Sequence, residues 1–268
     1  MNSLTNRQKS LQILNIVALV AVVVMNILST ALPINNRSVQ DISDALPSYF
    51  TPAGYTFSIW GLIYSALIAF TVYQALPVGG KRPFLQQISW LFAASSAANI
   101  GWLLSWHYEA YLLSIIFMVA LLVTLIAIYL RLNIGRPDPA LPTADKLLVQ
   151  APFSLYLGWI TVATIANISS VLNYWGWNGF GIAEPLWSAI MMGVATVVAG
   201  LLLFNRRNLA YAGVLVWALF GIRAAYADVA VVAGTAVVAA ILITLFALLG
   251  YWRTRQRPER AQPVPQAA

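Results

Sequence analysis

Long apolar stretches separated by short polar connections dominate this chain. Each stretch is close to the roughly 20 residues that an α-helix needs to cross the hydrocarbon core of a bilayer. We expect spanning helices over residues 11–33, 57–77, 84–106, 111–132, 148–172, 185–204, 209–226 and 228–252. The predicted fold class is therefore all-α: a polytopic membrane helical bundle of about eight transmembrane helices. A signal peptide is the alternative for the first stretch, but its apolar part is usually only about 7–15 residues long, so we favour a retained span.

The composition supports the same class of protein. Of the 268 residues, 60% are apolar and 9% are charged, against roughly 25% charged in a soluble protein. A chain this apolar requires lipid around it, because only its loops carry enough charge for water. The chain has no cysteine, which excludes disulfides, thiolate metal sites and a cysteine nucleophile.

The net charge of +7 has a topological explanation. Lys and Arg gather on the cytoplasmic side of membrane proteins. With the eight spans above and the N-terminus inside, every basic residue except Arg37 and Arg223 falls on the inner side. We therefore expect a multi-pass protein of the bacterial inner membrane with both termini in the cytoplasm. Its surroundings are the lipid membrane, and without a compact basic patch we expect no nucleic-acid partner.

Polar side chains inside the apolar stretches require a partner or a function. Asn26, Asn99 and Asn167 lie in the first, third and fifth stretches, about 8–10 Å below the outer helix ends at a rise of ~1.5 Å per residue. Tyr64 lies at a similar depth in the second. Two interpretations remain open. The asparagines bond to one another between helices, or they line a mostly apolar cavity that opens to the outer face.

Aromatic residues share the helix faces of these polar groups. Spacings of three or four residues pair Trp60 with Tyr64, Asn99 with Trp102, and Trp159 with Ala163 and Asn167. Tryptophan and tyrosine also collect at membrane–water boundaries for purely physical reasons. An interfacial belt is therefore the alternative to a binding site.

Three motifs resemble those of the TspO/MBR family, the tryptophan-rich sensory proteins and translocator proteins. Residues 52–64 look like the family's Pro-Pro-Gly-Trp-x-Phe…Val-Trp-x-x-Leu-Tyr signature, residues 99–102 like its Asn-x-x-Trp, and residues 159–167 like its Trp-x-x-Phe-Ala-x-x-Leu-Asn. They occur in the family's order, over about residues 10–172.

The family has five helices, and this chain continues for three more. We therefore expect a TspO-like five-helix domain over residues 1–172, a three-helix extension over residues 173–252 and a basic cytoplasmic tail over residues 253–268. Helices six to eight could serve as a docking face or a homodimer interface.

The resemblance implies a pocket for a flat hydrophobic ligand among helices one, two, three and five, beneath the loop between helices one and two. Bacterial members bind porphyrins and other tetrapyrroles, and animal members bind sterols. The residues that match the family's motifs and would line or support the pocket are Trp60, Tyr64, Asn99, Trp102, Trp159, Ala163 and Asn167, and Asn26 joins them by its depth. No cofactor is required, and porphyrin or haem is a candidate ligand. The predicted function is that of a membrane receptor or sensor.

Other functions are weighed against this one. An uncoupled transporter of hydrophobic molecules and a structural or partner-docking protein both remain alternatives. An enzyme is not favoured, because the chain has a single histidine, His107, no cysteine and no cluster of carboxylates near that histidine. We expect His107 at the membrane interface, with haem or metal ligation as its alternative role. We expect Arg223 at the lipid headgroups, with pairing to a ligand carboxylate as its alternative.

Overall fold

The computed structural model describes residues 5–31, 34–46 and 48–256. The eight long helices within these ranges are α1 (Asn6–Ala31), α3 (Ile59–Ala75), α6 (Leu91–His107), α7 (Tyr111–Arg131), α9 (Ala151–Tyr174), α10 (Glu184–Asn205), α11 (Leu209–Ala225) and α12 (Ala230–Gln256). Shorter helices are α2 (Val39–Ala45), α4 (Pro77–Gly80), α5 (Phe84–Ile88) and α8 (Thr143–Asp145). No strand occurs in the described ranges, and the all-α prediction is confirmed.

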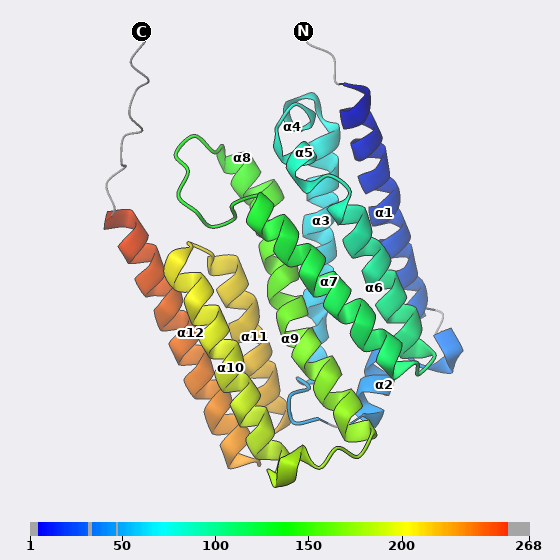
Figure 1. The fold of residues 1–268 in the computed structure, drawn as a ribbon, viewed down its shortest axis with the longest axis vertical. Helices are drawn as coiled ribbons and strands as arrows, with labels where there is room; N and C mark the ends of the chain where they lie inside the picture. Colours follow the sequence, from blue (N-terminus) through cyan, green and yellow to red (C-terminus); the bar gives the residue numbers. More distant parts are fainter. Residues whose placement is uncertain (1–4, 32–33, 47, 257–268) are drawn as a thin grey trace.

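Among the described residues, six helical segments are long and apolar enough to cross a membrane, and they correspond to α1, α3, α7, α9, α10 and α12. The other two predicted spans form α6 and α11, which have 17 residues each. At ~1.5 Å per residue such a helix reaches about 25 Å, which is near the lower limit for a spanning helix. Both lie alongside the longer helices (Figure 1).

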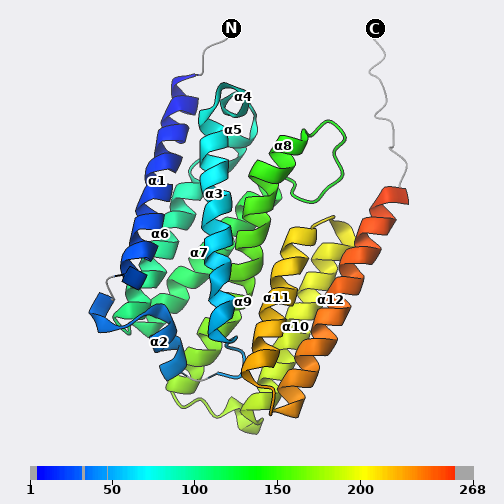
Figure 2. The ribbon, with the colours of Figure 1, turned by 180° about the vertical axis from the view of Figure 1, so that it is seen from behind.

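Five helices form a closed ring around a common interior. α1 packs against α6 and α3, α6 packs against α7, and both α7 and α3 pack against α9. These contacts bring the first five long helices of the chain together. The views from opposite sides agree on this arrangement (Figures 1 and 2).

The last three long helices form a second group beside the ring. α12 packs against both α10 and α11, and α11 packs against α9 of the ring. Figure 2 shows α11 between α9 and α12. The C-terminal group therefore joins the ring mainly through α11.

α1 begins and α12 ends at the same end of the bundle (Figure 1), which we call the inner end. The opposite, outer end carries α2 and the connection between α9 and α10. At the inner end, the nearly buried carboxylate of Asp145 accepts hydrogen bonds from Tyr73 Oη (2.7 Å) and Arg82 Nε (2.9 Å). At the outer end Arg37 forms a 2.8 Å salt bridge with Glu109.

The predicted third span, residues 84–106, is interrupted in the structure. Ser89 adopts the left-handed conformation, with φ of 52°, and separates α5 from α6. The prediction of one continuous helix was therefore wrong here. Apolar residues occupy both sides of the break, so composition alone does not reveal the break.

Other helix ends differ from the expected ones in smaller ways. The fifth span begins earlier than residue 148, since α8 and a wide π-helical turn over Lys146–Gln150 run directly into α9. Pro152 follows this turn, and a proline lacks the N–H that a regular helix would use there. The expected tail also begins later, because α12 continues to Gln256. Residues 257–268 lie outside the described chain.

Candidate ligand-binding cavity

The connection between α1 and α3 covers the outer end of the five-helix ring. We call its described residues, 34–46 and 48–58, the outer segment. The sequence predicts a polar loop here, but the segment contains α2, which begins with a capping box. Ser38 Oγ accepts from the Asp41 backbone N–H (3.1 Å), and the Asp41 carboxylate accepts from the Ser38 backbone N–H (2.7 Å). A helix start of this kind satisfies two backbone donors that would otherwise be unpaired.

A cavity lies under the outer segment, in the interior of the ring. Its free volume is about 40 Å³, enough for one to three water molecules. The residues that line it are Val39, Ser43, Thr51, Pro52, Phe57, Trp60, Trp102, Trp106, Met118, Trp159, Val162, Ala163, Ala166, Asn167 and Ser170. The outer segment, α3, α6, α7 and α9 all contribute to this lining.

Aromatic rings make up much of the cavity wall. Trp159 meets Trp60 edge to face, with ring centroids 6.2 Å apart, and meets Phe57 in the same way at 5.6 Å. Trp102 and Trp106 of α6 stack with an interplanar angle of 22°. Such arrangements are the favoured geometries for aromatic pairs. The cavity wall therefore offers a ligand flat aromatic faces and indole N–H groups.

Several polar atoms of these wall residues have no partner. The Nε1 atoms of Trp102, Trp106 and Trp159 are buried, and no described residue accepts a hydrogen bond from any of them. Asn167 Nδ2 donates to Ser114 Oγ at 3.2 Å, whereas Asn167 Oδ1 is buried without a donor in the described chain. Buried polar groups are nearly always hydrogen-bonded, and each exception needs an explanation.

The remaining amides form a network between helices beside the cavity. Asn26 Nδ2 of α1 donates to Asn99 Oδ1 of α6 at 3.1 Å, and Asn99 Nδ2 donates to Tyr156 Oη of α9 at 2.9 Å. The hydroxyl of Tyr64 lies close to both asparagines, and its ring stacks on Trp60 at 5.3 Å. The sequence left two interpretations open for these asparagines. For Asn26 and Asn99 the structure shows the first, hydrogen bonds between helices.

The structure thus divides the eight residues singled out in the sequence into two sets. Trp60, Trp102, Trp159, Ala163 and Asn167 line the cavity. Asn26, Tyr64 and Asn99 lie outside its lining and connect the helices next to it. The lining of this cavity differs from the pocket expected among helices one, two, three and five: among the described residues α1 contributes none, while the fourth helix, α7, contributes Met118.

Two wall or network residues were missed in the sequence. Trp106 is 3% exposed and lies four residues after Trp102, so the face shared with Asn99 and Trp102 could have identified it. Tyr156 lies three residues before Trp159 and could have been found by the same spacing.

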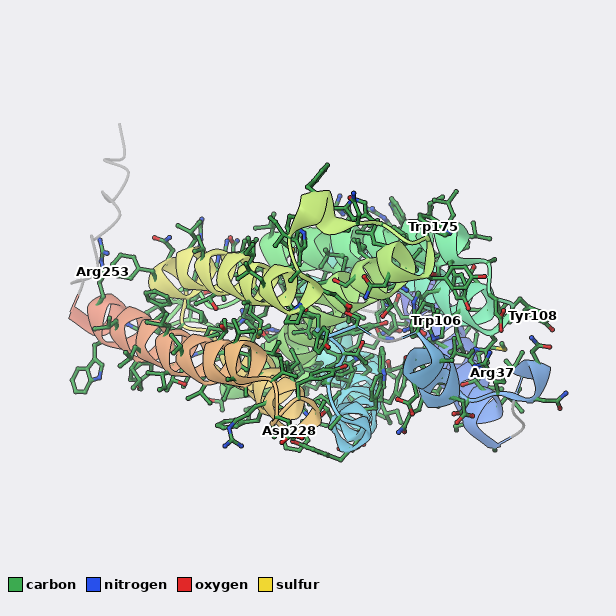
Figure 3. All side chains as sticks on the ribbon, turned by 90° about the horizontal axis from the view of Figure 1, so that it is seen from below. Arg37, Trp106, Tyr108, Trp175, Asp228 and Arg253 are labelled. Atoms are coloured by element: carbon green, nitrogen blue, oxygen red, sulfur yellow. The ribbon has the colours of Figure 1, made fainter. Side chains whose placement is uncertain are left out.

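Two other residues weighed in the sequence are placed by the structure. His107, expected at the membrane interface, is fully buried within the protein, and its Nδ1 lies 2.7 Å from the Leu103 carbonyl oxygen one turn back. Arg223 is exposed near the end of α11 and lies outside the cavity lining. Figure 3, which looks at the outer end, places Trp106 beside α2, with Arg37 and Tyr108 nearby.

α11 holds the outer segment in place. The Ala53 N–H donates to the Gly221 carbonyl oxygen (3.1 Å), and Trp217 Nε1 donates to the Thr56 carbonyl oxygen (3.1 Å). Gly221 is required at this contact, because an added Cβ would lie 2.1 Å from Thr56 Oγ1. The C-terminal helices are thereby connected to the cover of the cavity.

Comparison with known protein families agrees with the motifs and the five-helix ring. A family model described as "TSPO-like protein" matches residues 12–249. The chain belongs to the TSPO-like family. The match extends past the motifs at residues 52–167 and includes α10, α11 and α12 up to residue 249. No curated protein and no solved structure matches the chain. Family and apolar helices together make this TSPO-like protein an integral membrane protein.

Proposed function

We propose that this protein is a membrane receptor or sensor that binds a flat hydrophobic molecule of the tetrapyrrole class in the aromatic cavity. The observation that carries the proposal is the group of indole N–H donors of Trp102, Trp106 and Trp159, which are buried at one cavity and unpaired in the described chain. An unpaired buried donor costs about 1–3 kcal/mol. A ligand with acceptor atoms would recover part of that cost on binding.

The chemistry of the wall favours a planar, conjugated ligand. The rings of Trp60, Trp102 and Trp159 provide apolar faces, and the small side chain of Ala163 leaves space for a ring beside them. A porphyrin has flat faces for stacking and carboxylate oxygens for the indole donors. A simple hydrocarbon would leave the donors unpaired, so we expect it to bind less tightly.

Binding requires the outer segment to move. The cavity holds about 40 Å³, whereas sites for drug-sized ligands measure roughly 300–1,000 Å³. Val39, Ser43, Thr51 and Pro52 of the outer segment form its outer wall. A shift of this segment away from α9 would enlarge the cavity without disturbing the ring of helices. The proposal therefore includes an open state with the ligand bound beneath the segment.

We also propose that the inner end faces the cytoplasm. Among the described residues, the basic side chains of this end belong to its loops and helix termini: Arg7, Lys9, Lys81, Arg82, Arg131, Arg136, Lys146, Arg206, Arg207 and Arg253. Such an excess of basic residues marks the cytoplasmic side. The cavity would then receive ligand from the outer side of the membrane.

Titration of the purified protein with protoporphyrin IX, followed by the porphyrin absorbance in detergent, tests the binding proposal. Trp102→Phe, Trp106→Phe and Trp159→Phe each keep a ring and remove one N–H. We expect each to weaken binding about fivefold, which corresponds to ~1 kcal/mol for one hydrogen bond. Trp90→Phe is the control, because Trp90 is 58% exposed and lies outside the cavity. Wild-type affinity in all three cavity variants would refute the assignment.

A carrier is distinguished from a sensor by uptake of porphyrin into proteoliposomes. A sensor binds without flux above that of empty vesicles. Uptake that Trp159→Phe reduces would instead identify an uncoupled transporter that uses the same cavity.

A further inference from the structure

A second, larger cavity lies at the outer end, between the five-helix ring and the C-terminal group. It measures about 620 Å³, which is within the roughly 300–1,000 Å³ of small-molecule sites. Its walls come from α9, α10, the connection between them, and the end of α2 with Ser48. α9 separates it from the aromatic cavity, since residues 165, 168 and 169 line this cavity and residues 166, 167 and 170 line the other.

One carboxylate determines the charge of this cavity. Among the described residues that line it, Glu184 alone is charged. Asn173 Nδ2 donates a hydrogen bond to Glu184 Oε1 and so fixes the carboxylate at the start of α10. No salt bridge between described residues includes Glu184. A partly buried carboxylate in apolar surroundings is stabilised by a cation, and the cavity has room for one.

Two tryptophan rings line the same cavity as this carboxylate, Trp177 from the connection between α9 and α10 and Trp187 from α10. Trp177 and Trp187 lie with ring centroids 5.2 Å apart and an interplanar angle of 45°. Trp187 Nε1 donates to the Gly179 carbonyl oxygen at 2.6 Å, which fixes the ring. Gly179 has a φ of 61°, and an added Cβ would lie 2.7 Å from Trp187. Tryptophan faces attract organic cations through the ring quadrupole.

We propose that this cavity binds an amphipathic organic cation, with an apolar body between α9 and α10 and one ammonium-type group between Glu184 and the tryptophan rings. The apolar part of the wall, which includes Ile165, Leu172 and Met191, accommodates the body. The cation replaces the absent salt-bridge partner of Glu184. This site is separate from the proposed tetrapyrrole site and takes a ligand of the opposite charge.

Equilibrium dialysis with the tetraphenylphosphonium cation in a neutral maltoside detergent tests the proposal. Tetraphenylborate has the same shape and the opposite charge, so it separates recognition of charge from simple partition into the micelle. We expect saturable binding of the phosphonium, with one site per chain, and none of the borate. Equal uptake of the two ions would overturn the proposal.

Two variants locate the site. Glu184→Gln keeps the hydrogen bond with Asn173 and removes the charge, and we expect affinity for the phosphonium to fall about tenfold or more. Glu109→Gln is the matched control, because Glu109 lies at the same end and pairs with Arg37. Unchanged affinity in Glu184→Gln would overturn the proposal. If that variant fails to fold, Trp187→Leu and the comparison of the two ions on the wild type decide the question.

Two sources could supply the cation, and the same assay separates them. Phosphatidylcholine carries a quaternary ammonium group, whereas phosphatidylglycerol carries none. In nanodiscs of each lipid, the phosphonium affinity of the wild type is divided by that of Glu184→Gln. This ratio removes the general attraction of the lipid surface for the cation, because both proteins experience it equally. A smaller ratio in phosphatidylcholine identifies the lipid headgroup as the occupant, and equal ratios identify a free amine. Trp159 lines the aromatic cavity and not the cavity around Glu184, so Trp159→Phe should leave the phosphonium affinity unchanged. The cation proposal can therefore stand even if the tetrapyrrole proposal fails.

Discussion

The hydroxyl of Tyr226 donates a 2.7 Å hydrogen bond to the carbonyl oxygen of Ser48. These residues are 178 positions apart in the chain, yet they join the end of α11 to the segment that covers the aromatic cavity. The Tyr226 ring also contacts the ring of Tyr49 at 5.0 Å. Together with the contacts of Gly221 and Trp217, this bond holds the outer segment against the C-terminal helices.

Removal of this bond should make the cavity easier to open. Tyr226→Phe keeps the ring contact and loses one hydrogen bond, worth about 1 kcal/mol. If the closed segment limits entry, the porphyrin association rate should rise about fivefold, because the open state becomes more populated. Stopped-flow fluorescence measures this rate. Tyr108→Phe, at an exposed residue of the same end, is the control. An association rate equal to that of the wild type would show that the segment does not limit entry.

The close contact at Gly221 gives a second prediction. In Gly221→Ala the new methyl group meets Thr56 Oγ1 and Pro52 Cβ, which lie 2.1 and 2.9 Å from the added Cβ position. We expect a loss of stability of about 1–3 kcal/mol from this overlap, seen as a lower midpoint of thermal unfolding. Gly213→Ala is the matched control on the same helix, since nothing lies within 4 Å of its added Cβ. There the better helix propensity of alanine should leave stability unchanged or slightly raised.

The amide network should contribute to stability more than to ligand affinity. Asn99→Ala removes the bonds to Asn26 and Tyr156 and leaves the Tyr156 hydroxyl buried without its donor. Hydrogen bonds between helices in membranes contribute about 0.6–2 kcal/mol, and we expect a loss in that range in denaturation by sodium dodecyl sulfate. Asn205→Ala is the control, because the Asn205 side chain donates to the Leu201 carbonyl oxygen of its own helix. A larger loss of porphyrin affinity than of stability would instead place Asn99 in the ligand site.

The capping box of α2 predicts a dependence on pH. The Ser38 backbone N–H donates to the Asp41 carboxylate and lowers the pKa of that carboxyl below its usual value. A lowered pKa in the folded state means that the ionised form stabilises α2 above the unfolded pKa of about 3.9. This stabilisation is lost as the pH falls through the lowered pKa. α2 should therefore loosen below about pH 4.

A spin label on α2 can detect this loosening, because the chain has no native cysteine. With the label at Gln40→Cys, we expect mobility to rise as the pH falls from 5 to 3, values chosen to bracket the usual carboxyl pKa of about 3.9. In Asp41→Ala the label should already be mobile at neutral pH and change little on acidification. A label that behaves alike in the two proteins would contradict the role of the cap.

The sequence determined the helices and the faces of their functional residues. Backbone groups in lipid must be satisfied within the chain, so apolar stretches of this length form helices, and each of the eight predicted stretches contains a long helix. Spacings of three or four fixed the faces that Trp102, Trp159 and Asn167 share with their neighbours. The break at Ser89 and the helix in the outer segment escaped this reasoning, because they depend on single-residue conformations and caps.

Only the tertiary structure decided which polar groups pair and which do not. The sequence places Asn99 and Asn167 at similar depths in their helices, yet Asn99 meets Asn26 and Tyr156 while Asn167 keeps an unpaired oxygen at the cavity. The rotation of each helix and the identity of its neighbours come from packing between segments far apart in the chain. The Tyr226–Ser48 bond and the outer cavity around Glu184 arise in the same way, because both form where the C-terminal helices meet the ring.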